Sequence, residues 1–141
     1  MQKRRVSIIL FFDKNGRILI QDRRGYKKGA DFGFFGGKIE DGETPEEALI
    51  REIKEELGFK IKDFSLFKHY TKEYLEKDWE IEYYVYYAPI PVIENLVVNE
   101  GQIHLTNFKD FKALDLSEND VCLIKSISSY LKKRKSNNGI I

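Results

Sequence analysis

Hydrophobic and polar positions along the chain indicate a β-rich frame. Two short runs rich in apolar and β-branched residues, Val6–Asp13 and Arg17–Asp22, are separated by Asp-Lys-Asn-Gly, which is typical of a hairpin turn. Further along, Phe64–Leu75 and Trp79–Ile90 are longer strand-like stretches. In the second of them, hydrophobic side chains recur at every other position, as they do in a half-buried strand. Four strands are therefore expected from these runs.

The segment after the first two strands carries the clearest helix signals. Thr44 is a good N-cap, proline suits the first helical position, and Glu47 completes a capping box. Gly58 suits the position just past a helix end. We therefore expect a helix over Pro45–Leu57.

The C-terminal half predicts shorter elements. Strands are expected at Leu96–Val98 and Gln102–Phe108, and a second helix is expected to run from Ser117 to Lys133. This order of strands and helices predicts the mixed α+β form of the α/β class, a mixed β-sheet flanked by helices in an α/β/α sandwich. We expect residues 1–133 to form a single domain, and the basic and polar segment 134–141 to be a flexible tail.

Composition and charge narrow the classes of function. The 141 residues include 24 Lys and Arg against 23 Asp and Glu, so the formal net charge is +1 and a nucleic-acid partner is not expected. No apolar run approaches the roughly 18 residues of a membrane span. The single cysteine cannot form a disulfide within the chain, and we expect a cytoplasmic protein.

One face of the predicted helix carries three glutamates. Glu52, Glu55 and Glu56 lie within an arc of about 100° on a regular helix. Like charges at this spacing repel one another, and the helix C-terminus favours cations instead. A hard divalent cation, Mg²⁺ or Mn²⁺, would neutralise the cluster. The alternative is a solvated face on which Arg51 softens the repulsion.

A longer pattern surrounds these glutamates. The segment Gly37–Phe59 reads GKIEDGETPEEALIREIKEELGF. Its fixed positions are Gly37, Glu43, Arg51-Glu52-Ile53, Glu55-Glu56 and Gly58-Phe59. At this spacing the segment resembles a complete Nudix box, and the likeness in strand order extends roughly from Arg4 to Leu131. The resemblance implies a Nudix fold and a Nudix-type hydrolase, which cleaves a nucleoside diphosphate linked to another group by attack of water at phosphorus.

The resemblance also implies roles for the residues of the box. Mg²⁺, with Mn²⁺ as an alternative, would be bound by the carboxylates of Glu52, Glu55 and Glu56 and by the backbone carbonyl of Gly37. Glu43 would be an auxiliary carboxylate that supports the loop or a further metal ion. Arg51 would orient the carboxylates through a salt bridge.

The residue that removes the proton from water is left open. Glu55 or Glu56 is the first choice within the box, while Glu100, in a later loop, is either such a base or an ordinary turn residue. Similar proteins carry a phosphate-binding arginine at the position of Arg23. Lys38 lies inside the box, where it either reaches a phosphate or belongs to the surface.

The expected substrate is a small-molecule nucleotide. A (deoxy)nucleoside triphosphate, such as an oxidised or non-standard one, is the leading candidate, and ADP-ribose or a dinucleoside polyphosphate is the alternative. A rival of another class is a Nudix-like domain that senses a nucleotide without cleaving it, although the retention of all box carboxylates favours an enzyme. A homodimer is left open.

Overall fold

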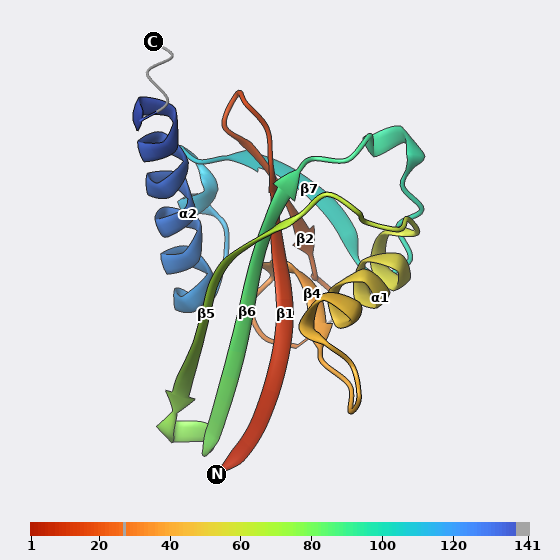
Figure 1. Cartoon of the computed structure of the whole chain (residues 1–141), viewed down its shortest axis with the longest axis vertical. Coiled ribbons are helices and arrows are strands. Elements are labelled where there is room, and N and C mark those ends of the chain that lie inside the picture. The colour runs from red at the N-terminus through yellow and green to blue at the C-terminus, as the bar shows by residue number, and fades with distance from the viewer. Residues whose placement is uncertain (27, 138–141) are drawn as a thin grey trace.

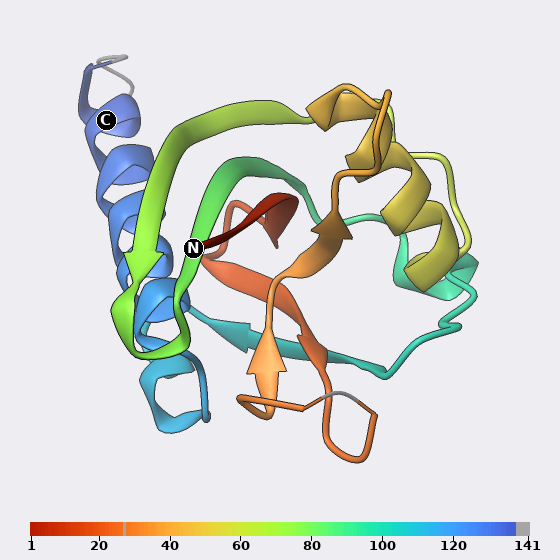
Figure 2. The same ribbon diagram turned by 90° about the horizontal axis from the view of Figure 1, so that it is seen from below.

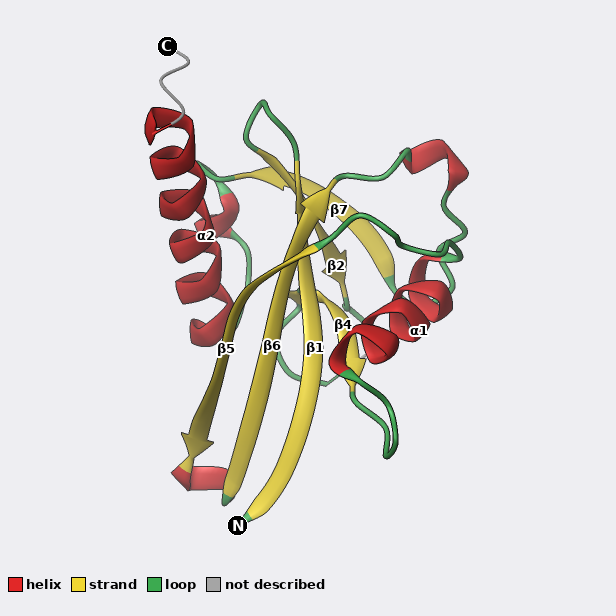
Figure 3. Cartoon of the chain, in the orientation of Figure 1, coloured by secondary structure: helices red, strands yellow, loops and turns green. Residues whose placement is uncertain are grey.

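The computed structural model describes residues 1–26 and 28–137, and seven strands in this part of the chain form one mixed sheet (Figure 1). The strands are β1 (Gln2–Phe12), β2 (Arg17–Asp22), β3 (Phe32–Gly33), β4 (Phe35–Lys38), β5 (Ser65–Tyr74), β6 (Trp79–Pro89) and β7 (Gln102–Asn107). The helices are α1 (Pro45–Leu57) and α2 (Glu118–Asn137), with short 3-10 turns η1 (Leu75–Lys77), η2 (Ile93–Asn95) and η3 (Phe111–Ala113). The predicted mixed sheet flanked by helices is confirmed (Figure 3).

Strand β1 organises the sheet. The strand order is β3-β2-β1-β6-β5, and β1 runs parallel to β6 along its whole length while its other neighbours are antiparallel. β1 pairs with β4 through Val6–Ile9 and with β2 only at Phe11–Phe12. β2 continues the sheet by pairing with β7, which Figure 2 shows beside it. The divided pairing of β1 brings the Gly36–Gly37 segment of β4 close to the end of β2.

The two faces of the sheet bury separate apolar clusters. On β1, Ile9 and Phe11 pack with α1, whereas Leu10 packs with α2. This alternation follows from the two-residue period of a strand. The α1 cluster includes Leu49, Ile53 and Leu57, and the α2 cluster includes Leu123, Ile124 and Ile127. Helix α1 is therefore fixed to the sheet by its apolar flank.

The segment expected as a strand at Leu96–Val98 is not a strand. Its backbone follows the C-terminal end of α1, where the Val97 N–H donates to the Leu57 carbonyl at 3.0 Å and the Asn99 N–H donates to the Glu56 carbonyl at 2.9 Å. Carbonyls at a helix end lack partners within the helix, and this segment supplies them. The prediction was wrong because the N–H groups satisfy a helix rather than a sheet.

The second helix is longer than expected. It continues past Lys133 to Asn137, so Arg134 belongs to α2 and not to a flexible tail. The Arg134 guanidinium donates to the Tyr87 hydroxyl at 3.1 Å and lies over the Tyr130 ring, which ties the last turn to β6. Residues 138–141 of the expected tail lie outside the described residues. None of the helices in residues 1–26 and 28–137 is both long and apolar enough to cross a membrane.

Candidate active site

Helix α1 begins and ends where the sequence predicts. The Thr44 hydroxyl accepts the Glu47 N–H at 3.1 Å, and the Glu47 carboxylate accepts the Thr44 N–H at 2.8 Å. Gly58, with a φ of 71°, takes the left-handed conformation at the other end, and its N–H donates to the Lys54 carbonyl. These caps fix the two ends of the helix, and its apolar flank, which packs on the sheet, decides which carboxylates face the sheet.

The Glu56 carboxylate is buried with 0% exposure beneath the double-glycine strand. Its Oε1 accepts the Gly36 N–H at 2.8 Å, and its Oε2 accepts Gln21 Nε2 at 3.2 Å. A buried carboxylate is tolerated only with such donors around it. Glu56 is therefore held from two sides, by β4 and by β2.

Gly37 packs directly against the side chain of Glu52. A Cβ at position 37 would lie 2.6 Å from the Glu52 carboxyl carbon, so only glycine admits this approach. The Glu52 side chain is 15% exposed, and its burial raises the pKa of its carboxyl group against the opposing effect of Arg51. The box glycine and this carboxylate are thus brought together.

Arg51 links the carboxylates of the box. Its guanidinium donates to Glu43 at 2.8 and 3.0 Å, to Glu52 at 2.9 Å and to the Lys38 carbonyl at 2.9 Å. The hydrogen bonds with Glu43 raise the pKa of Arg51 and lower that of Glu43. The Glu43 carboxylate also accepts the Glu40 N–H, so it joins its own loop to the helix.

The Glu55 side chain is more open than its neighbours. It is 49% exposed and lies 3.4 Å from Arg51. Among the described residues, no group of three or more His, Cys, Asp or Glu side chains is arranged to hold a metal ion as it stands. The donors nevertheless suit a hard cation, because oxygen atoms from Glu52 and Glu56 flank the Gly36–Gly37 backbone, where a Cβ would displace Glu52.

Glu100 approaches this group from the loop before β7. Its carbonyl accepts Gln21 Nε2 at 3.3 Å, and its charge contributes to the raised pKa of Glu52. Partial burial and the Glu100 charge also raise the pKa of the Tyr26 hydroxyl, which is hydrogen-bonded to Glu100. The structure therefore places Glu100 close to the box carboxylates.

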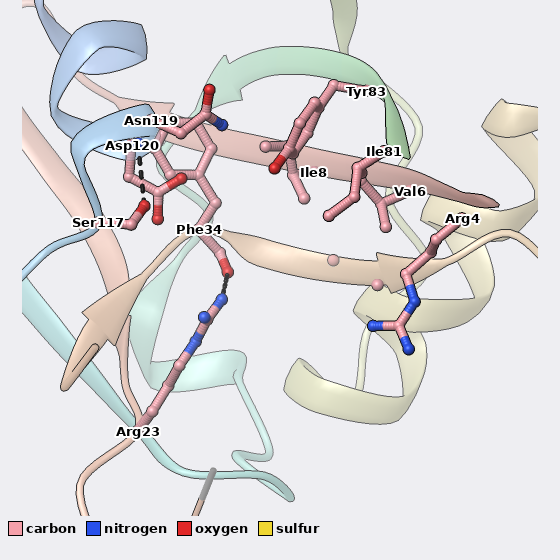
Figure 4. A pocket seen from close by; sticks show the side chains of 12 residues that line it. Arg4, Val6, Ile8, Arg23, Phe34, Ile81, Tyr83, Ser117, Asn119 and Asp120 are labelled. Atoms are coloured by element: carbon pink, nitrogen blue, oxygen red, sulfur yellow. Dashed lines mark hydrogen bonds between the residues drawn. The ribbon is translucent and has the colours of Figure 1, made fainter. Parts of the chain in front are cut away.

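A pocket of about 280 Å³ opens beside the box glycines (Figure 4). Strand β4 contributes the glycine pair at the start of the box, Gly36 just before it and Gly37 as its first residue. Arg23 follows the end of β2, and Asn119 and Asp120 come from the start of α2. The far wall is made of Arg4, Val6, Ile8, Ile81 and Tyr83. Figure 4 shows the Arg23 side chain pointing to the Phe34 carbonyl, to which it donates at 2.6 Å. Lys38 is exposed and is not among the residues that line this pocket.

Asn119 and Asp120 were not predicted as site residues from the sequence. The Asn119 Oδ1 accepts the Tyr70 hydroxyl at 2.7 Å, and burial raises the pKa of the Asp120 carboxyl group to about 6. Both follow Ser117, whose hydroxyl accepts the Asp120 N–H at 3.1 Å. Polar residues are common at the start of a helix, where they cap it. A single sequence therefore gives no signal that distinguishes a capping role of this pair from a binding role.

A mixed sheet with a glutamate-bearing helix behind a double-glycine strand defines the Nudix class of fold. The family model of the NUDIX domain matches residues 1–127, and the chain belongs to this family.

Curated relatives match parts of the chain. It is 37% identical over 78 residues to an 8-oxo-dGTP diphosphatase of Escherichia coli (strain K12), and the alignment covers 55% of this chain and 60% of that protein. It is 30% identical over 88 residues to an 8-oxo-dGTP diphosphatase of Proteus vulgaris, covering 60% of this chain and 79% of that protein. The first alignment thus spans less than two thirds of the relative.

A solved structure matches over nearly the whole chain. It comes from work on MutT of Aliivibrio salmonicida and Vibrio cholerae, and it aligns with a TM-score of 0.74 at 21% identity. The match covers 92% of this chain and 99% of that one. At this identity the likeness supports the fold.

Proposed function

We propose that this protein is a Nudix pyrophosphohydrolase that acts on a (deoxy)nucleoside triphosphate, with an oxidised purine nucleotide as its substrate. The observation that carries the proposal is the position of the pocket, which is lined by the box glycines and by Arg23. Its volume of about 280 Å³ is near the lower end for small-molecule sites. The relatives named 8-oxo-dGTP diphosphatases support an oxidised guanine nucleotide.

The proposed cofactor is Mg²⁺, which Mn²⁺ can replace. Glu52, Glu56 and the Gly37 carbonyl would hold it, and Glu55 would join them by leaving Arg51, since its side chain is half exposed. When bound, the cation shields the phosphate charges and makes water a better nucleophile. Arg51 holds the carboxylates in orientation, and its hydrogen bonds to Glu43 and Glu52 support this role.

The remaining roles fall to residues outside the helix. Arg23 contacts a phosphate, because it lines the pocket beside the box glycines and its guanidinium is held by the Phe34 carbonyl. Glu100 takes the proton from the attacking water. It is favoured over Glu56, whose two oxygens accept Gly36 and Gln21, and over Glu55, which lies against Arg51. Lys38, an exposed residue that follows Gly37, is proposed as a weaker phosphate contact.

A substrate panel tests the proposal. Nucleotide products are separated by anion-exchange chromatography after incubation with Mg²⁺ and oxidised or ordinary nucleoside triphosphates, ADP-ribose or dinucleoside polyphosphates. This readout detects the monophosphate formed with pyrophosphate from a triphosphate, and also the AMP or other mononucleotides formed from the remaining substrates. The expected result is faster turnover of an oxidised triphosphate than of the other substrates. EDTA should abolish this turnover, and added Mg²⁺ should restore it. Turnover of ADP-ribose or dinucleotides alone would favour the alternative hydrolase, and binding without turnover would favour a nucleotide sensor.

Glu100→Gln tests the proton acceptor. Because the amide keeps the shape but not the basicity, kcat should fall by about 100-fold or more. Glu94→Gln, an exposed carboxylate in η2, is the matched control and should keep wild-type activity. If Glu100→Gln stays active while Glu55→Gln loses activity, the base belongs to the box.

The cytoplasmic location and a homodimer remain predictions, and size-exclusion chromatography of the purified protein tests the homodimer.

A further inference from the structure

Gln21 is a buried polar residue at the end of an apolar strand. It follows Ile18, Leu19 and Ile20 in β2, and its own exposure is 0%. A buried amide must satisfy its hydrogen-bonding groups within the protein. The bonds it makes join parts of the site that are far apart in the chain.

The Gln21 amide has one orientation that satisfies its neighbours. Its Oε1 accepts Arg23 Nε at 3.0 Å, while its Nε2 donates to Glu56 Oε2 at 3.2 Å and to the Glu100 carbonyl at 3.3 Å. A guanidinium only donates, and a carboxylate or carbonyl only accepts. Turning the amide over would set donors against donors on one side and acceptors against acceptors on the other.

We propose that Gln21 is a positioning residue that holds the metal-binding carboxylate of Glu56 and the phosphate-binding guanidinium of Arg23 in a fixed relation. The inference rests on the proposed function for what these two groups bind. The far end of each group is anchored as well, since Glu56 Oε1 accepts the Gly36 N–H and Arg23 donates to the Phe34 carbonyl. Gln21 thus completes a continuous chain of hydrogen bonds. It runs from Gly36 in β4 to Glu56 in α1, then through Gln21 and Arg23 to the Phe34 carbonyl, which lies between β3 and β4.

This chain of contacts has a consequence for the reaction. A phosphate that is bound by Arg23 and a cation that is held by Glu56 must lie at a defined separation for water to attack in line. A side chain that touches both groups can set this separation, and a buried amide with a single allowed orientation does so rigidly. Gln21 thus aligns substrate and cofactor without contacting either.

Gln21→Met is the first variant, because methionine is similar in length but lacks the amide. Binding of Mn²⁺ to the nucleotide-free protein is followed by electron paramagnetic resonance of the free ion. Loss of the bond to Glu56 should weaken Mn²⁺ binding by about 10-fold. Steady-state kinetics with Mg²⁺ should show a lower kcat and, because Arg23 is released, a higher KM.

A double-mutant cycle separates positioning from general damage. In a Glu56→Gln background the carboxylate that Gln21 holds is gone, so adding Gln21→Met should weaken Mn²⁺ binding by less than about 2-fold. Ile18→Val, a buried neighbour in β2 that packs on the other face, is the stability control and should bind Mn²⁺ as the wild type does. Gln21→Asn is the second variant if methionine prevents folding, since the shorter amide cannot span both partners.

The outcomes are distinct. Wild-type Mn²⁺ affinity and kcat in folded Gln21→Met would overturn the positioning role, as would an equal loss of affinity with and without the Glu56 carboxylate. The Mn²⁺ titration needs no nucleotide. A protein with the expected Gln21 dependence and no turnover of any nucleotide would refute the proposed function only. A wild-type protein that binds no Mn²⁺ would overturn both.

Discussion

The neighbouring glycines of β4, Gly36 and Gly37, should differ sharply in their response to alanine. Gly36 has a φ of 126°, and a Cβ there would clash with the Ser7 carbonyl oxygen and lie 2.8 Å from Ile8 Cα. Both are backbone atoms of β1, the strand that pairs with Gly36. A Cβ on Gly37 would instead meet the carboxyl end of the Glu52 side chain, at 2.6 to 2.8 Å. One obstacle is rigid and the other can move.

The magnitudes follow from these contacts. In Gly36→Ala, an unfavourable φ and overpacking against backbone should together cost roughly 2–6 kcal/mol, out of a typical 5–15 kcal/mol for a whole domain. Tm should fall by roughly 6 °C or more. In Gly37→Ala, the Glu52 carboxylate must retreat by about 1 Å to regain ordinary contact distances. Such a displacement at a reacting centre can lower the rate about 100-fold.

Two measurements on the same samples decide the point. Thermal unfolding followed by circular dichroism should show a large fall in Tm for Gly36→Ala and a nearly wild-type Tm for Gly37→Ala. Mn²⁺ titration of the folded protein should show weaker binding for Gly37→Ala. A Gly37→Ala protein that is as unstable as Gly36→Ala, or that binds Mn²⁺ normally, would refute the assignment of Glu52 as the yielding contact.

Two further predictions concern the helices. Thr44→Ala removes the acceptor for the Glu47 N–H, and the free energy of unfolding should fall by about 1 kcal/mol. Tm should fall by about 3 °C, while kcat stays unchanged. An unaltered Tm would show that the cap contributes nothing. For Asp120, burial raises the pKa to about 6 in the folded state, so the folded protein retains a proton that the unfolded chain releases near pH 4. The contribution of Asp120 to the free energy of unfolding should therefore decline as pH rises between these values. Urea denaturation at about pH 4 and about pH 7 should show a smaller decline for Asp120→Asn, and an equal decline would assign the effect to other groups.

The local signals in the sequence were sufficient for α1. Its limits at Pro45 and Leu57 agree with the structure, because Thr44, Glu47 and Gly58 act on backbone groups within a few residues of themselves. The limits of β2, β5, β6 and β7 were also close, but β1 begins at Gln2 and not at Val6, and the short strands β3 and β4 were not predicted. The pairing of β1 with β6 joins segments about half the chain apart. Leu96–Val98 shows the limit of such signals, because its partner is the end of a helix that periodicity cannot identify.

Helical periodicity placed three glutamates on one face but could not distinguish their surroundings. Glu56 is buried against Gly36, while Glu55 is half exposed beside Arg51. The difference comes from the sheet, because β4 and β2 cover the side of α1 that carries Glu56. A Glu-rich helix is therefore compatible with a solvated face or a metal site, and the strand that covers it decides between them.

The same reasoning explains why Gln21 escaped notice. Within Arg-Ile-Leu-Ile-Gln-Asp a glutamine looks like the polar end of a strand, and its partners are 35 residues away at Glu56 and 79 residues away at Glu100. No pattern along the chain connects such positions. The packing of α1 on the sheet brings Glu56 to Gln21, and the pairing of β2 with β7 brings the Glu100 segment to it. The box supplies carboxylates at the right spacing, and their orientation depends on a residue outside the box. If Gln21 holds Glu56 as proposed, we expect proteins with identical boxes to differ in metal affinity through the residue at the end of β2.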